Sequence, residues 1–557
     1  MYNQIDLVFY SASKSLKYDF NVKPQGNPSQ IKFKYKGVNS IDLSKGRLII
    51  KTSVNKVIED KPYAYQTING VITKVECNYT LKNGVVGFEF PNGYNKNLDL
   101  VIVPTLIFST FSGSTSNNFG YTATFDRDGF LYSGSTAFGG TYPTTTGAYD
   151  RSFNGGIVDV AISKYDTTGM TMVYSTFVGG SSDELPHSMI TNSNDELFVY
   201  GTTSSLDFPY TTGCYDSIFN GGTALNLTSG LGVNFINGSD IFVIRLSQPG
   251  DSLMGGTLVG GSGNDGLNSS STNDLRYNYA DEVRGEIEID KNNNIYVVSC
   301  TRSLNFPVSG SAFQRMHGGS DLDGVVFKMD NKLTTMIWSS YLGGNGDDAA
   351  YSLALDKNDN AYVAGGTNSS DFIKSPDAID TTYNGVRCDG FITKINTTGS
   401  VVLRSTYYGT DLYDQIYFIE LDRKDSVYVF GQTDKMDSSF IKNAAYFTFN
   451  SGQFITKMSS DLDTIEWSTV FGSGGGGPNI SPTAFLVDVC NKIYLSGWGG
   501  TTNQFGTTNN AIATTGMDTT AGAFQTTTDG SDFYLMVLES DASNIVYGSY
   551  FGGNVSA

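Results

Sequence analysis

Acidic side chains recur in the glycine-rich loops of this chain, each time shortly after the same apolar phrase. They are Asp183, Glu184, Asp265, Asp347, Asp348, Asp411 and Asp414. Carboxylate oxygens on a flexible loop are the ligands that Ca²⁺ prefers. In the competing interpretation, each carboxylate accepts hydrogen bonds from the backbone of the next turn and needs no metal. No loop repeats the full ligand spacing of an EF-hand, so both interpretations stay open, and calcium is the one cofactor that the sequence suggests.

Residues that typically carry catalysis are few. The two histidines, His187 and His317, lie in different repeat units, and neither is part of an HExxH or GxSxG motif. Carboxylates are plentiful, but nothing in the sequence selects two of them as a glycosidase pair. No glycine pair is followed by the Gly-Lys-Ser/Thr of a phosphate-binding loop. We therefore predict that the chain is not an enzyme, and we name no catalytic or cofactor-binding residue.

Long insertions rich in Gly, Asn, Thr and Ser are the second class of candidate site. They cover residues 222–239, 264–280, 473–481 and 500–520. The aromatic residues in or beside them are Phe235, Tyr277, Tyr279, Trp498 and Phe505. Binding usually evolves on variable loops of a rigid scaffold, so we predict that these residues contact a partner. The alternative is that the loops are tolerated surface insertions, because long loops cost little free energy.

One short phrase occurs seven times between these loops. Its copies are FSTFSGS from Phe108, YSTFVGG from Tyr174, GGTLVGG from Gly255, WSSYLGG from Trp338, RSTYYGT from Arg404, WSTVFGS from Trp467 and YGSYFGG from Tyr547. A unit that repeats with variable insertions is one supersecondary piece that must stack on its neighbours. The chain is therefore a repeat protein.

Each unit contains four strand signals, which we call A to D. Strand A ends in an Asx-rich turn, as in LALDKNDN (353–360), and strand B follows at once. Strand C has the pattern Asp-x-apolar-apolar-x-Lys/Arg, as in 159–164, and strand D is the repeated phrase. Four antiparallel strands in each unit predict the blades of a β-propeller, because radial packing removes long exposed edges.

We expect six blades after residue 104, with strands A to C of the last blade within 482–541. The phrases at 106–111 and 545–551 then compete for the remaining strand D position. A seven-bladed ring is the alternative.

Residues 1–104 have a different pattern. Apolar and polar residues alternate in short runs separated by turns such as Asn83-Gly84, which predicts an antiparallel β domain of sandwich type. Pro104 marks the expected junction. The predicted fold is thus all-β, with a domain at 1–104 and a propeller of six, or alternatively seven, four-stranded blades at 105–557.

Composition excludes several classes of partner. The net charge of -19 would repel nucleic acid over most of the surface. No stretch approaches 18 apolar residues, so we expect no membrane span. The five cysteines lie far apart, which indicates neither a disulfide framework nor a zinc site.

The repeated units resemble the bacterial β-propeller repeat family called SBBP. The segments TTSSLDFP (202–209), TRSLNFP (301–307) and TNSSDF (367–372) match the last element of its typical unit. The region with IDLVFY, LKYDFNVKPQGNPSQIKFKYKG and AYQTING is similar to an uncharacterised domain that often precedes such repeats. The resemblance implies a large exported protein at a bacterial surface, of the kind that in Bacteroidota-like organisms carries adhesive modules and a type IX secretion signal.

The sequence thus predicts an extracellular or cell-surface, non-catalytic propeller that is part of a larger adhesin or filament. The expected partners are protein subunits, including further copies of the chain, or surface glycans. Two alternatives stay open: a carbohydrate-binding propeller, and an enzyme that acts on polysaccharide at the propeller mouth.

Overall fold

The fold comes from a computed structural model of residues 1–557. The structure describes all of these except 1, 3, 13–14, 36–39, 45, 52–55, 60, 69–70, 104–111, 168, 170, 228–231, 270–271, 273, 280, 501–512, 522 and 554–557. The chain divides into two compact units, Met1–Thr110 and Phe111–Ala557. The boundary predicted at Pro104 lies outside the described residues.

The N-terminal unit is an antiparallel β domain with one core. Its sheets contain β1 (Ile5–Ala12), β2 (Ser15–Val22), β10 (Leu100–Val103), β6 (Tyr63–Ile68) and β7 (Val71–Val75) in that order, then β3 (Ser40–Ser44), β4 (Arg47–Lys51) and β5 (Lys56–Glu59), then β8 (Asn78–Lys82) and β9 (Val85–Glu89). A 3-10 turn, η1 (Pro28–Gln30), precedes β3. Alternating residues of several strands, such as Phe20, Leu48 and Phe88, meet in the core, as the period-2 pattern predicts.

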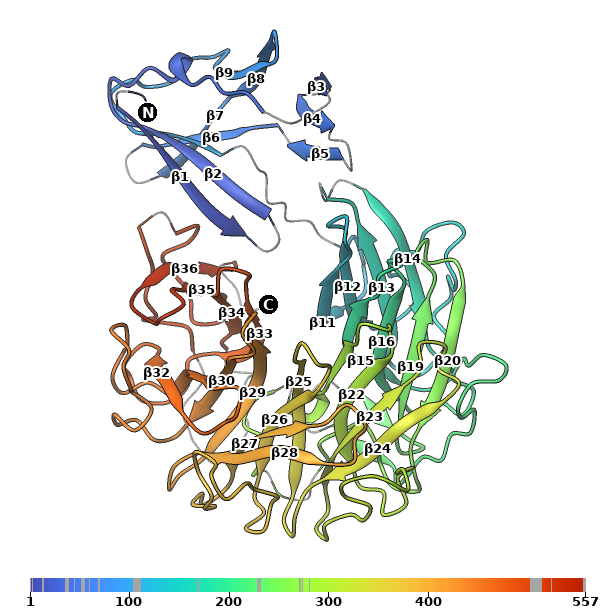
Figure 1. The fold of residues 1–557 in the computed structure, drawn as a ribbon. Coiled ribbons are helices and arrows are strands. Elements are labelled where there is room, and N and C mark those ends of the chain that lie inside the picture. Colours follow the sequence, from blue (N-terminus) through green and yellow to red (C-terminus); the bar gives the residue numbers. More distant parts are fainter. Residues whose placement is uncertain are drawn as a thin grey trace. The chain divides into compact units, whose positions relative to one another are not determined.

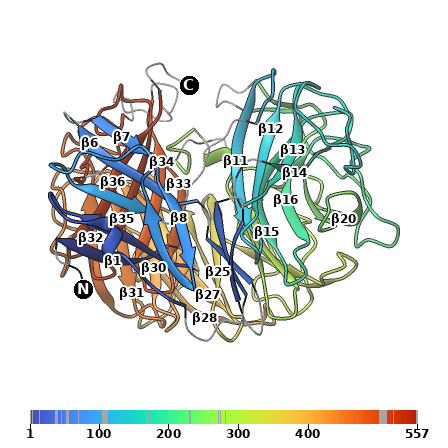
Figure 2. The ribbon, with the colours of Figure 1, turned by 90° about the horizontal axis from the view of Figure 1, so that it is seen from above.

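The second unit is a propeller of six four-stranded antiparallel sheets (Figures 1 and 2). Blade one contains β11 (Asn118–Phe125), β12 (Leu131–Ala137), β13 (Asp159–Tyr165) and β14 (Met172–Val178), and blade two contains β15 (Glu184–Thr191), β16 (Leu197–Thr203), β19 (Asp240–Leu246) and β20 (Leu253–Val259). Blade three contains β21 (Glu286–Ile289), β22 (Ile295–Thr301), β23 (Asp323–Met329) and β24 (Met336–Leu342), and blade four contains β25 (Asp348–Leu355), β26 (Ala361–Thr367), β27 (Asp389–Ile395) and β28 (Val402–Tyr408). Blade five contains β29 (Asp414–Leu421), β30 (Val427–Thr433), β31 (Gln453–Met458) and β32 (Ile465–Phe471), and blade six contains β33 (Ser481–Val487), β34 (Ile493–Trp498), β35 (Phe533–Leu538) and β36 (Ile545–Phe551). The order of strands in every sheet is A, B, C, D. The predicted blades are confirmed.

Two short elements lie outside the blades: the hairpin β17 (Leu225–Asn226) with β18 (Asn234–Phe235), and the 3-10 turn η2 (Asp281–Val283). No helix in the described part of the chain is long and apolar enough to cross a membrane.

In blades one, three, four and five, an aspartate in the turn between strands A and B makes the same set of contacts. In blade one, Asp126 Oδ1 accepts hydrogen bonds from the backbone N–H groups of Asp128 (3.1 Å) and Phe130 (2.9 Å). Its Oδ2 lies 2.9 Å from Nζ of Lys164 on strand C. Asp290, Asp356 and Asp422 have the equivalent lysine partner in blades three to five. The aspartate thus joins the turn to strand C inside its own blade.

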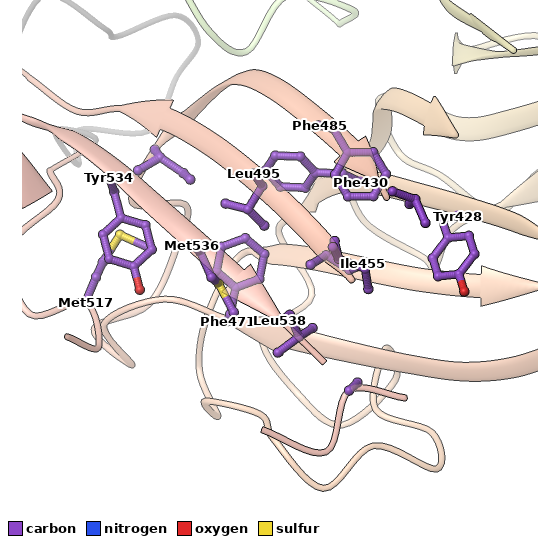
Figure 3. Close-up of a cluster of buried hydrophobic side chains, with 14 of the residues drawn as sticks. Tyr428, Phe430, Ile455, Phe471, Phe485, Leu495, Met517, Tyr534, Met536 and Leu538 are labelled. Carbon is purple, nitrogen blue, oxygen red and sulfur yellow. The ribbon is translucent and has the colours of Figure 1, made fainter. Parts of the chain in front are cut away.

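Neighbouring blades pack through one repeated contact, in which a strand A side chain inserts into the face of the preceding blade. The inserted residues are Met189, Ile287, Leu353, Ile419 and Phe485. Figure 3 shows this contact between blades five and six, where the ring of Phe485 lies 5.7 Å from that of Phe430. Because each side chain is buried by the blade before it, no blade completes its own core.

In the described part of the chain, blades one and six lack the junction that joins neighbouring blades. Strand A of blades two to six packs on the blade before it, whereas no described strand of blade six packs along a described strand of blade one. The phrase at 545–551 is β36, strand D of blade six. The competing copy at 106–111 lies outside the described residues.

Candidate functional site

The centre of the propeller is occupied by the insertion that leads from β20 to β21. Leu275 and Tyr277 of this insertion are buried against Tyr351, Tyr413 and Tyr417. These tyrosines belong to blades four and five, and the ring of Tyr277 stacks on that of Tyr413 with 4.6 Å between centroids. The insertion therefore packs against the innermost strands of blades that follow its own.

Hydrogen bonds hold the insertion in this position. Asn278 Nδ2 donates to Oε1 of Gln432 (2.8 Å), and the hydroxyl of Tyr277 donates to Oδ1 of Asp434 (3.0 Å). Arg284 donates to the backbone oxygen of Pro482 in blade six (3.1 Å) and to Asp281 (2.7 Å). Because buried polar groups are costly without partners, these bonds fix one conformation of the insertion.

Two of the residues that we predict to contact a partner are buried in the structure, and their contact with a partner stays a prediction. Phe235 in β18 is fully buried beside Leu185 and Val233, and Tyr277 is buried as described above. Tyr279 and Trp498 are half-buried, with ring centroids 5.8 Å apart in an edge-on contact. Phe505 lies outside the described residues. An aromatic residue in a long loop looks exposed in a sequence, but here such rings fill space between blades.

A cavity of about 380 Å³ opens beside the turns between strands A and B of blades three to five. Its lining includes Glu288, Asp290, Lys291, Asp356, Asp359 and Glu420. Glu288 and Glu420 come from innermost strands of different blades, which the propeller geometry brings to one place. Nζ of Lys291 lies 3.7 Å from Oδ1 of Asp359 at the edge of this group.

Three glutamates in or beside this cavity have raised pKa values, whereas the pKa values of Asp290 and Asp356 are lowered. Burial, helped by the charge of Glu286, raises the pKa of Glu288 to about 8. Burial raises the pKa of Glu286 to about 7, against the opposing hydrogen bonds from Ser352 and Leu353. The pKa of Glu420 is also raised, by burial and then by the charges of Glu286 and Glu288. Neutral carboxyl groups can donate hydrogen bonds, whereas their ionised forms attract cations.

The sequence does not predict that these three glutamates lie close together. Glu286 and Glu288 alternate with apolar residues on strand A, a pattern that usually indicates a solvent-facing side of a strand. The radial arrangement of the blades places the side of strand A that carries Glu286 and Glu288 toward the axis of the propeller and toward Glu420.

Buried carboxyl pairs lie at the four junctions between blades one and five. Each pair joins the first residue of strand C to an acidic residue of the next blade that lies opposite the last residue of its strand B: Asp159 with Glu184, Asp240 with Asp265, Asp323 with Asp348, and Asp389 with Asp414. They flank a glycine of the repeated phrase, so a Cβ at Gly260 would lie 2.5 Å from Asp240 Oδ1 and 2.9 Å from Asp265 Oδ2. Burial raises the pKa of Asp240 to about 8 and that of Asp265 to about 7.

The predicted calcium residues all accept hydrogen bonds from, or pair with, groups of the protein. Asp183 accepts from the backbone N–H groups of Val158 (3.2 Å) and Asn234 (2.8 Å), which lie in two different loops. Asp347 accepts from the N–H of Asp321 (3.1 Å), and Asp411 pairs with Lys435 (2.8 Å).

The other four predicted calcium residues belong to the buried pairs. Asp348, for example, accepts from the N–H of Gly344 and from the hydroxyl of Ser369, both at 2.7 Å. Within the described ranges, His, Cys, Asp and Glu side chains nowhere gather in threes as metal ligands would. Calcium binding stays a prediction.

The two histidines lie in unlike surroundings. His187 is buried, with Nδ1 3.2 Å from the hydroxyl of Tyr200 and Nε2 3.1 Å from that of Thr202. Burial lowers its pKa to about 3, so it stays neutral at ordinary pH. Burial also lowers the pKa of His317. Both arrangements are typical of structural histidines.

Comparisons with known proteins identify parts of both units. Residues 1–105 match a domain of unknown function, DUF7948, and residues 337–373 match the beta-propeller repeat SBBP. No curated protein matches the chain.

Several solved structures are similar to this one. A protein of unknown function from Dyadobacter fermentans is 13% identical, with a TM-score of 0.35, over 70% of this chain and 92% of that chain. A variant of NanB sialidase from Streptococcus pneumoniae is 11% identical, with a TM-score of 0.37, over 88% of this chain and 91% of that chain. A gluconolactonase from Xanthomonas campestris is 8% identical, with a TM-score of 0.28, over 69% and 84%. The chain thus combines a DUF7948 domain with a β-propeller that contains an SBBP repeat.

Proposed function

We propose that this chain is an exported, non-catalytic interaction module, which binds protein subunits or surface glycans through the blade surfaces and outer loops. The observation that carries the proposal is the occupied centre of the propeller. The side chains of Leu275, Tyr277 and Asn278 fill the place where a propeller would otherwise receive a small ligand along its axis. Contacts with a partner are then left to the outer surfaces of a rigid scaffold.

The first experiment applies the whole chain to a glycan array and to a panel of polysaccharides in a reducing-sugar assay. We expect retention on a subset of glycans or on a protein partner, and no release of sugar. Antibody against the propeller should label intact cells of the organism that produces it. Release of reducing sugar by the purified chain would overturn the non-catalytic part, and labelling only after cell lysis would overturn export.

The carboxyl-lined cavity favours a second candidate function, which is action on a polysaccharide. A protonated carboxyl can give its proton to a glycosidic oxygen while a second, ionised carboxyl assists. Glu288 and Glu420 are the pair that the cavity supplies, and because both pKa values are raised, this candidate requires a pH near or above about 8, at which Glu288 ionises while Glu420 keeps its proton. Glu288→Gln and Glu420→Gln would each abolish hydrolysis under this candidate, and Lys291→Gln at the rim is the matched control. Hydrolysis that survives both changes would eliminate the candidate.

A further inference from the structure

Blade six leaves apolar side chains uncovered at positions that every inner blade buries. Leu535 stands three residues after the first aspartate of strand C and is 37% exposed, whereas Val243, Ile392 and Ile455 at the same position of blades two, four and five are 0% exposed. Phe551 at the end of strand D is 42% exposed, and its counterpart Phe471 is 1% exposed. In the inner blades these positions receive the strand A side chain of the next blade.

A polar position of blade six has lost its partner in the same way. Asp532 has the place in the repeat that Asp240, Asp323 and Asp389 have in their blades, where each pairs with an acidic residue of the following blade. No strand A follows Asp532 in the part of the chain that the structure describes, and its Oδ2 accepts from Gln525 instead (2.9 Å). Blade six therefore has both the apolar and the polar residues of an inter-blade junction, but no following blade packs against them in the described part of the chain.

Blade one is a poor fit to this surface. The strand A position that inserts into the preceding blade is a large buried residue in blades two to six, but in blade one it is Ala123, which is exposed. Direct contact between blades one and six would bring only a methyl group to the surface formed by Leu535 and Phe551. Interiors are close-packed, so such a contact would leave a void.

The sequence contains one strand D phrase more than the six blades use. Six copies form β14, β20, β24, β28, β32 and β36, and the seventh, FSTFSGS from Phe108, precedes β11. We propose that the open faces of blades one and six hold a seventh four-stranded blade of the same repeat, supplied by the same polypeptide. Its strand A would insert between Leu535 and Phe551, as Phe485 does in blade five.

The test adds three strands to the chain. A copy of residues 348–396, which contain strands A to C of blade four, is attached directly after Ser556 in place of Ala557, so that strand A follows Phe551 at the same distance in the chain as Asp348 follows Leu342. We expect the extended chain to melt several degrees higher than the original, and hydrogen exchange in β35 and β11 to slow about tenfold or more. Unchanged melting and exchange would overturn the proposal.

Two variants show whether the added strands occupy the proposed surface. Leu535→Asp should remove the gain of the extended chain and change the melting temperature of the original chain by no more than about 1 °C. Val546→Asp is the matched control, because Val546 is 42% exposed and its counterparts Val173 and Ile337 are exposed in closed junctions too. It should leave the gain intact.

A disulfide test examines direct closure of six blades. Ala123→Cys and Leu535→Cys are combined in the original chain with Cys490→Ser, which removes the exposed native thiol. We expect no cross-link within the monomer under mild oxidation, because the two faces are not in contact. Rapid formation of that cross-link, or a dimer that protects β35 from exchange, would contradict a seventh blade in the same polypeptide.

Discussion

The inner junctions of the propeller and its open end contain the same kinds of residue in different surroundings. Ile392 and Leu535 have equivalent places on strand C, yet only Ile392 is covered by a following blade. Gly344 and Gly553 have equivalent places after strand D, yet only Gly344 is enclosed by other side chains. The comparison teaches that a residue of the repeat contributes to stability through the next blade, and contributes little where that blade is missing.

The largest expected effect comes from shortening the buried member of such a pair. Ile392→Ala leaves a cavity between blades four and five and should lower the free energy of unfolding by about 2–5 kcal/mol. Leu535→Ala, at the matching exposed position, should cost less than about 1 kcal/mol. Urea denaturation measures both values. Equal losses would show that Leu535 is buried in solution.

A smaller effect is expected from adding a methyl group at the equivalent glycines. In Gly344→Ala, the new Cβ would lie 2.5 Å from Oδ1 of Asp371 and 2.6 Å from Cβ of Ser369, so the backbone must shift. The cost should be about 1–3 kcal/mol. Gly553→Ala meets nothing within 4 Å and should be neutral. Thermal melts of the two variants measure these costs. An unchanged melting temperature in Gly344→Ala would contradict the close packing of this junction.

The buried carboxyl pairs predict a dependence on pH that the junction between blades five and six does not share. Burial raises the pKa of Asp159, Asp323 and Asp389 to about 7 and that of Asp240 to about 8. The folded chain therefore keeps protons that the unfolded chain has already released. The contribution of these pairs to the free energy of unfolding should be largest below about pH 4 and fall as the pH rises to about 8.

Asp240→Asn sharpens this prediction. The amide cannot ionise, so the decline in stability between about pH 5 and pH 8 should become shallower. Gln453→Glu at the junction of blades five and six, where Gln453 Oε1 accepts from the N–H of Asn479, should make it steeper. Urea titrations at several pH values measure the slope, and stability that rises through this range would refute the assignment of neutral carboxyls.

The smallest effect is expected from metal. Because the acidic loop residues accept hydrogen bonds from protein groups, as Asp348 does from Gly344 and Ser369, we expect EDTA or added Ca²⁺ to shift the melting temperature by less than about 1 °C. A larger drop in EDTA, reversed by Ca²⁺, would favour the calcium interpretation of these loops.

The sequence predicts the blades well, because each strand has a local signal. The aspartate turns, the strand C pattern and the repeated phrase mark β25 to β28 within a residue or two, and the same signals recur in the other blades. Alternation of apolar residues similarly predicts the N-terminal β domain. These features depend on contacts between neighbours in the sequence, which is why they can be read from it.

The candidate site is harder to predict, because its residues come from different blades and meet only through the radial arrangement of those blades. Glu288 and Glu420 are brought together by the radial order of blades three and five. The burial of Tyr277 depends on Tyr413, far away along the chain. No local pattern distinguishes a loop that enters the centre of a propeller from one that stays on its surface, so the sequence does not indicate that Phe235 and Tyr277 are buried.

The insertion in the centre has a consequence for how the protein folds. In a simple repeat array, each unit interacts only with the next, and unfolding can spread from either end one unit at a time. Here Arg284 bonds to Pro482 and Asn278 to Gln432, so a segment before blade three is tied to blades five and six. Such contacts close very long loops and slow the search for the native state. In return, the inner blades should unfold as one cooperative unit, with fraying limited to the uncovered faces at the two ends of the array.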